Sequence, residues 1–110
     1  MLTRHGVVCP VMIVRGDGSV MELDYARRRP VEMIHSGPAT SAIGGQYLAA
    51  IERGLVVDVG GTTTDLALVE RGAIQAAPRS ATVGSYRTCV QTIHARSFGL
   101  GGDSRIWFDH

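Results

Sequence analysis

Short apolar runs alternate along the chain with glycine, proline and charged residues, a pattern typical of a small α/β domain. Residues 6–14 are apolar and β-branched, which predicts a strand buried on both faces. Residues 15–19 carry an Asp-Gly pair, a strong hairpin signal, and residues 20–23 are the expected return strand. We expect Asp24 to cap a short helical turn and residues 31–35 to form another short strand.

One long helix is predicted over residues 38–53. Ser36 can cap its first turn, and Pro38 suits a first helical position, where its missing N–H has no intrahelical partner. Gly54 stands where a left-handed C-terminal cap is expected. Many other positions are glycine or alanine, so another backbone can come close to the helix. The larger apolar side chains predict its packing stripe: Ile43, Tyr47, Leu48 and Ile51.

A β-meander is predicted after the helix, over residues 55–77. Its first two strands, 55–59 and 63–70, enclose a polar corner, and a tight turn leads to a third strand at 73–77. A last short strand is expected at residues 105–108. The sequence therefore predicts a mostly β layer with one main helix packed on it.

Length and charge narrow the function classes. The chain has 110 residues, enough for one small domain, and its net charge of +1 argues against a nucleic-acid partner. Cys9 and Cys89 belong to no metal or disulfide pattern, so we expect free thiols in a reducing compartment, with a single bridge between them as the alternative and with Cys9 buried in a strand. We find no signal peptide and no apolar stretch near the ~20 residues that span a bilayer. These features predict a cytoplasmic protein without a membrane partner.

The corner at residues 58–65 carries the candidate chemistry. Gly60 and Gly61 allow a tight turn whose backbone N–H groups can converge on anionic oxygens. Asp58 and Asp65 would repel a phosphate unless a divalent cation lay between them, which suggests Mg²⁺ held largely through water. A plain hairpin with a Gly-Gly turn is the alternative, but the full pattern favours half of a nucleotide site. Three further hydroxyl groups lie at the same place: Thr62, Thr63 and Thr64.

The corner sequence DVGGTTTD closely resembles the phosphate motif of the actin, sugar-kinase and Hsp70 ATPase superfamily. Within it, the chain resembles the hydantoinase A/5-oxoprolinase family through two more segments. SGPA at 36–39, followed by AIGG at 42–45, is similar to a family helix, and GLGGDSRI at 99–106 is similar to its GAGGGSI segment. Asp103 stands where a third glycine is expected.

The resemblance implies an α/β fold: a ribonuclease-H-like (actin-type ATPase) half-domain with a mixed sheet and one main helix. It implies ATP and Mg²⁺ as cofactors, and a small cyclic amide or ketone as substrate. Asp58 would face the Mg²⁺ water shell, and Asp65 would orient the attacking oxygen or a metal-bound water. The implied phosphate-binding groups are the N–H groups of Gly60 and Gly61 and the hydroxyls of Thr62, Thr63 and Thr64. Gly101 and Gly102 would form a second nest near the nucleotide, with a structural turn as the alternative.

Family members are several times longer and carry another such motif, with the ATP site between two halves. We therefore expect a fragment or an unusually short homologue, organised as one partial domain. Its expected parts are a connecting helix at 38–53, a phosphate-loop meander at 55–77 and a glycine-rich segment at 97–109. The implied function is an ATP-dependent hydrolase of cyclic amides, or a related carboxylase, that needs the remaining protein or a second subunit. A small-molecule kinase and a non-catalytic assembly or binding subunit are the alternatives.

Overall fold

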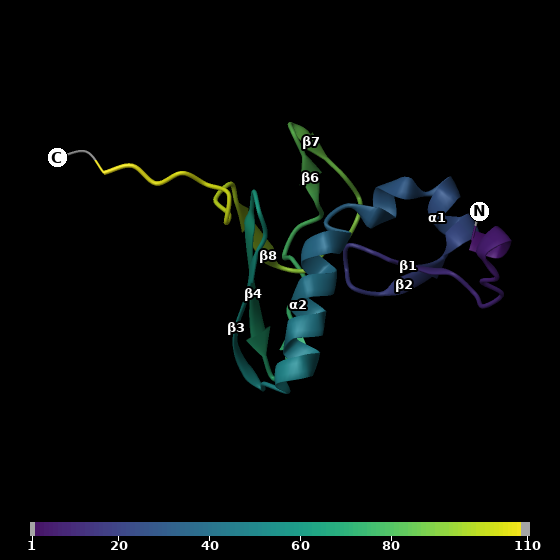
Figure 1. Cartoon of the computed structure of the whole chain (residues 1–110), viewed down its shortest axis with the longest axis horizontal. Coiled ribbons are helices and arrows are strands. Elements are labelled where there is room, and N and C mark those ends of the chain that lie inside the picture. Colours follow the sequence, from purple (N-terminus) through teal and green to yellow (C-terminus); the bar gives the residue numbers. More distant parts are fainter. Residues whose placement is uncertain (1, 109–110) are drawn as a thin grey trace.

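The computed structural model describes residues 2–108 and places one long helix between two β-elements (Figure 1). The N-terminal half contains η1 (Leu2–His5), β1 (Met12–Val14), β2 (Val20–Glu22), α1 (Leu23–Arg28), η2 (Pro30–Met33) and the long helix α2 (Ser36–Ala49). The C-terminal half contains β3 (Arg53–Val59), β4 (Thr64–Glu70), β5 (Ala73–Ile74), β6 (Thr82–Val83), β7 (Tyr86–Arg87) and β8 (Ala95–Phe98).

Strand β4 lies at the centre of the main sheet. It pairs along its whole length with β3, from Arg53 opposite Glu70 to Val59 opposite Thr64. On its other edge it pairs with β8 near its start and with β5 near its end. Every strand pair within residues 2–108 is antiparallel, so the expected mixed sheet is not seen there. The α/β class and the single main helix are confirmed, and the ribonuclease-H-like assignment stays a prediction.

Helix α2 packs on the sheet through its smallest residues. Ala39 and Ala42 are buried, and a Cβ on Gly45 would lie 2.8 Å from Cγ1 of Val56. The predicted apolar stripe is wrong, because Tyr47 and Leu48 are 79% and 84% exposed. Small side chains let the helix backbone lie closer to the sheet than a stripe of large residues would allow.

The bounds of α2 differ from the sequence prediction at both ends. The helix begins at Ser36, and its N-cap is His35, which makes no side-chain cap hydrogen bond. It ends at Ala49, and Ala50 takes the left-handed conformation (φ 50°) that was expected of Gly54. Gly54 instead lies inside β3, because the pairing with β4 extends back to Arg53. The helix therefore ends four residues earlier, and the following strand begins two residues earlier, than predicted.

The N-terminal predictions are only partly correct. The hairpin of β1 and β2 is confirmed, but β1 begins at Met12, and Cys9 is an exposed free thiol rather than a buried one. Asp24 makes no cap; its carboxylate pairs with Arg27 within α1. The expected strand at 31–35 is wrong: this segment contributes to the 3₁₀ helix η2.

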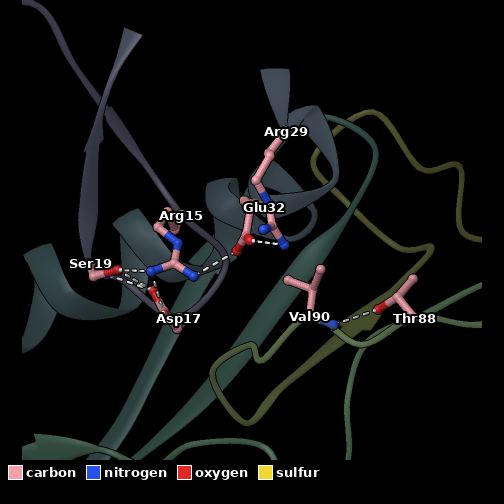
Figure 2. A network of polar contacts seen from close by, with 7 residues as sticks. All are labelled: Arg15, Asp17, Ser19, Arg29, Glu32, Thr88 and Val90. Carbon is pink, nitrogen blue, oxygen red and sulfur yellow. Dashed lines mark hydrogen bonds and ion pairs between the residues drawn. The ribbon is translucent and has the colours of Figure 1, made fainter. Parts of the chain in front are cut away.

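Burial of one carboxylate explains η2. Glu32 is buried and pairs with Arg15 at 2.6 Å and Arg29 at 3.0 Å (Figure 2). Its backbone carbonyl also accepts a hydrogen bond from the amide of Gly16. These contacts tie η2 to the β1–β2 hairpin, and a 3₁₀ turn presents the Glu32 carboxylate to both arginines.

After β8, residues 99–104 still contact the β3–β4 turn, and the C-terminal tail leaves the body of the domain beyond them (Figure 1). The predicted strand at 105–108 is wrong. In this segment, Cζ of Arg105 lies 3.8 Å from the ring centroid of Trp107. Asp109, the last residue of the expected glycine-rich segment, lies outside the described residues. Within residues 2–108, every helix is too short or too polar to cross a membrane.

Candidate functional site

Two carboxylates face each other across the main sheet. Asp58 of β3 and Asp65 of β4 are direct register partners, so both side chains project from the same face. Both residues are half-buried. Directly opposed side chains in an antiparallel pair have Cβ atoms about 5 Å apart, close enough for two carboxylates to share one cation. The sequence brings them together because the strands are joined by a turn of only four residues, 60–63.

Helix α2 covers these aspartates with its first turns. Pro38, Ser41 and Ala42 line the same narrow space as Asp58 and Asp65, and this space leaves no room for a water molecule. A ligand therefore cannot enter between helix and sheet and would have to reach the carboxylates from outside this space. Small residues at the start of α2 allow this close approach.

A hydroxyl from the third strand completes a polar row. Ser97 of β8 is the register partner of Asp65 on its other side, and its Oγ donates a hydrogen bond to Oδ1 of Asp65. Ser97 is exposed, so this end of the row is open to solvent. Asp58, Asp65 and Ser97 therefore lie side by side on three neighbouring strands.

The turn between β3 and β4 presents free backbone donors. The amide of Gly60 donates to the carbonyl of Thr63 at 2.9 Å, which closes the turn. Among residues 2–108, the amides of Gly61, Thr62 and Thr63 have no hydrogen-bond acceptor. Gly61, Thr62 and Thr63 are also exposed, so their N–H groups and hydroxyls can reach a ligand.

Thr64 lies apart from the other candidate residues. Because side chains alternate along a strand, Thr64 projects from the face opposite Asp65. Its Oγ1 donates to the carbonyl of Leu100 at 2.6 Å. This hydroxyl is therefore engaged within the chain, on the face away from the aspartates.

The second glycine-rich segment lies directly on the turn. The amide of Gly102 donates to the carbonyl of Gly60 at 2.9 Å, and the amide of Asp103 donates to the carbonyl of Gly61 at 2.8 Å. The amide of Gly101 donates to Oγ of Ser104 at 2.9 Å. The N–H groups of Gly101 and Gly102 therefore point at their own chain.

The donor set suits a hydrated Mg²⁺ rather than a metal caged by protein ligands. Mg²⁺ binds oxygen, keeps several waters and is commonly held by one or two carboxylates together with phosphate. Asp58 and Asp65 supply two carboxylates on one face. Within residues 2–108, no group of three or more metal-ligating side chains gathers, either here or elsewhere. These two aspartates would hold the cation next to the donors of the turn.

Sequence reasoning missed two residues of this site. Ser97 was not singled out because strand register, which sets it beside Asp65, leaves no signal in a single sequence. In the sequence, Asp103 stands out only as a departure from the glycine pattern. Its Oδ2 lies 2.7 Å from the position that a Cβ on Gly61 would occupy. Its place beside the turn follows from the contact between the two glycine-rich segments, which lie far apart in sequence.

A wider pocket of about 480 Å³ lies at the other end of β3 and β4. It contains none of the candidate site residues. Its lining consists of Arg53, Glu70, Arg71 and Gln75. The volume of this pocket therefore does not mark the position of the candidate site.

Comparisons with known proteins identify similar folds and the family of the chain. One solved structure of similar fold is acetone carboxylase in its nucleotide-free form, from work on the mechanism of ATP-dependent acetone carboxylation. The TM-score is 0.77 at 20% sequence identity, and the match covers 90% of this chain but 14% of the acetone carboxylase chain. Among curated proteins, none matches this chain. The hydantoinase/oxoprolinase family model matches residues 1–110, and the chain therefore belongs to the hydantoinase/oxoprolinase family.

Proposed function

We propose that this chain carries the phosphate-binding turn of an ATP-dependent hydrolase of cyclic amides, or of a related carboxylase. One observation carries the proposal: Asp58 and Asp65 face each other beside a turn whose amides at residues 61–63 have no hydrogen-bond acceptor within residues 2–108. Carboxylates attract cations, whereas backbone N–H groups attract anions. A ligand that carries both charges therefore explains why the two kinds of group lie side by side. A magnesium-bound polyphosphate is such a ligand.

Each residue has a distinct proposed role. Asp58 faces the water shell of Mg²⁺, and Asp65 orients the attacking oxygen or a metal-bound water. The amide of Gly60 already closes the turn, so Gly61 provides the glycine N–H, with further donors from Thr62 and Thr63. When bound, Mg·ATP supplies the phosphoryl group that activates a poorly reactive carbonyl oxygen.

The amides of the second glycine-rich segment are not free to bind phosphate directly. Gly101 and Gly102 donate within the chain, so a nucleotide would reach their N–H groups only after these bonds open. Thr64 likewise would have to release Leu100 to donate its hydroxyl to a phosphate. We therefore assign the first contacts with phosphate to residues 61–63.

The substrate class follows from the family. A small cyclic amide, or a ketone in a carboxylase, would present the carbonyl oxygen that is phosphorylated. The chain spans 14% of the acetone carboxylase chain. We therefore propose that the substrate binds to other parts of a larger protein. The 110-residue chain provides one wall of the site and is expected to be inactive alone. Steady ATP turnover by the purified chain, abolished in Asp65→Ala, would contradict that expectation.

Large exposed apolar surfaces support a need for further protein. Tyr47 and Leu48 project from the outer side of α2. On the sheet face opposite the aspartates, several apolar residues are each about half exposed: Leu55, Val57, Val59, Leu68 and Phe98. Contiguous apolar surface on this scale is normally covered. We propose that the rest of a larger polypeptide, or a second subunit, covers these faces, and that the assembly acts in the cytoplasm.

Isothermal titration calorimetry of the chain with ATP tests the proposed site. We expect binding in the presence of Mg²⁺ and at least a tenfold weaker affinity in EDTA, equivalent to about 1.4 kcal/mol. Asp65→Asn should weaken the Mg²⁺-dependent binding to a similar extent. Glu70→Gln removes one negative charge from the far end of the same strand and is the matched control. Equal affinity with and without Mg²⁺, or equal losses in both variants, would contradict the proposal.

A further inference from the structure

The segment from Gly99 to Ser104 makes a folded turn against the 60–63 turn. It is braced internally, because the amide of Ser104 donates to the carbonyl of Gly101 at 3.0 Å and the amide of Gly101 donates back to Oγ of Ser104. It contacts the 60–63 turn through backbone groups, so the contact fixes the backbone of both segments.

The contact is made by backbone carbonyl groups of the 60–63 turn. The carbonyls of Gly60 and Gly61 accept hydrogen bonds from Gly102 and Asp103, at 2.9 and 2.8 Å. A peptide unit is planar, so fixing the carbonyl of Gly61 also fixes the direction of the next N–H group, that of Thr62. In the same way, the carbonyl of Gly60 fixes the N–H group of Gly61. These are two of the amides assigned to phosphate.

Gly101 is the point of closest approach. A Cβ at this position would lie 2.6 Å from the carbonyl oxygen of Gly60 and would also meet the carbonyl of Gly61. Both obstructing groups are backbone, so no side chain can move aside. By contrast, a Cβ on Gly99 would meet no atom within 4 Å. The sequence motif therefore contains one glycine that the contact requires and one that it does not.

We infer that the 99–104 turn is a positioning element, which holds the amides of Gly61 and Thr62 in their ligand-binding orientation. This inference rests on the proposed function for the identity of the ligand. It differs from the expectation that Gly101 and Gly102 bind the nucleotide through their own amides. In this arrangement the glycines act through the carbonyls of the 60–63 turn, and the turn binds the phosphate.

Amide hydrogen exchange, followed by NMR on the chain without nucleotide, tests the contact itself. The amides of Gly102 and Asp103 should exchange at least about tenfold more slowly than that of Gly99, as expected for one hydrogen bond. Gly101→Ala should remove this protection, whereas Gly99→Ala should keep it. Rapid exchange of Gly102 and Asp103 in the unmodified chain would overturn the inference, whether or not the chain binds nucleotide.

Binding of Mg·ATP then tests the positioning role. Gly101→Ala should weaken the affinity about tenfold, equivalent to about 1.4 kcal/mol, and Gly99→Ala should leave it unchanged. The exchange protection of Gly102 and Asp103 should persist in the bound state. Loss of protection on binding would favour direct contact of these amides with the nucleotide and overturn the inference, as would unchanged affinity in Gly101→Ala.

A second variant guards against a folding defect. If circular dichroism shows that Gly101→Ala loses its sheet, Ser104→Ala replaces it, because this change removes the brace on the Gly101 amide without adding atoms. It should reduce both the protection of Gly102 and the affinity for Mg·ATP. A folded Ser104→Ala chain with reduced protection and full affinity would overturn the positioning role. Failure of the unmodified chain to bind Mg·ATP, with protection intact, would refute the proposed function and not the contact.

Discussion

Asp58 and Asp65 lie directly opposite each other on β3 and β4, on the sheet face that α2 covers. Like charges in this position repel each other across the strand pair. No basic side chain pairs with either of them within residues 2–108. The pair is therefore a feature that costs stability in the absence of a ligand, and a cation between the carboxylates would remove that cost.

Asp58→Asn should stabilise the chain while it weakens Mg²⁺-dependent nucleotide binding. Removing one of two opposed charges relieves the repulsion, which is worth about 0.5 kcal/mol for a cross-strand pair. Urea unfolding at neutral pH and low salt would measure the gain. A lower urea midpoint for Asp58→Asn would show that the carboxylate supports the fold instead.

Ser97→Ala should weaken binding of Mg·ATP about fivefold, because Asp65 loses the donor that holds one of its oxygens. Ser97→Thr keeps a hydroxyl on a strand position and should restore most of the affinity. The same Ala substitution should have no further effect in an Asp65→Ala background. An undiminished effect there would mean that Ser97 acts through the fold rather than through Asp65.

Substitution by alanine should change thermal stability in opposite directions at Gly44 and at Gly45. A Cβ on Gly44 would meet no atom within 4 Å, so Gly44→Ala should stabilise the helix by about 1 kcal/mol. A Cβ on Gly45 would lie 2.8 Å from Cγ1 of Val56 and would push α2 from the sheet. Gly45→Ala should therefore give a lower thermal midpoint than Gly44→Ala. Equal midpoints would contradict the close packing of α2 on β3.

The hairpin should lose stability in acid through Asp17. Partial burial acts to raise the pKa of Asp17, but hydrogen bonds from Ser19 and the charge of Arg15 outweigh it, so the pKa lies below 3.8 (Figure 2). A carboxyl whose pKa is lower in the folded chain stabilises it above pH 3.8, and that contribution disappears as the pH falls through the folded pKa.

Asp17→Asn lacks this contribution at every pH. Urea midpoints should therefore show the variant less stable than the original chain at about pH 7, with a smaller difference at about pH 3. Ser19 and Arg15 remain in both chains, so the comparison isolates the carboxylate. A difference that stays constant or grows in acid would contradict this explanation.

Much of the site was predictable because local sequence determines it. The DVGGTTTD corner specifies two strands joined by a tight turn, and a hairpin of that length places Asp58 opposite Asp65. The hairpin at Asp17 and Gly18 follows for the same reason, since Gly18 takes the positive φ that the turn requires (φ 85°). These predictions involve residues close in sequence, where turn chemistry decides the structure.

The remaining errors come from contacts between distant segments. Residues 31–35 have the composition of a strand, but residues 31–33 form part of a 3₁₀ helix in which Glu32 is buried against Arg15. Large residues of α2 suggest a packing stripe, yet Val56 and its neighbours accept only the small ones. The contact of residues 99–104 with the phosphate turn likewise depends on the antiparallel pairing of β8 with β4. Such contacts leave no periodic signal in a single sequence.

NMR titration of the ¹⁵N-labelled chain with ATP, with and without Mg²⁺, would show directly whether phosphate binds at the β3–β4 turn. We expect the largest amide shifts at Gly61, Thr62 and Thr63, and we expect them to require Mg²⁺ and to be lost in Asp65→Asn. Shifts that centre on the pocket between Arg53 and Arg71, or that are equally large without Mg²⁺, would contradict a metal-bridged phosphate site at the β3–β4 turn.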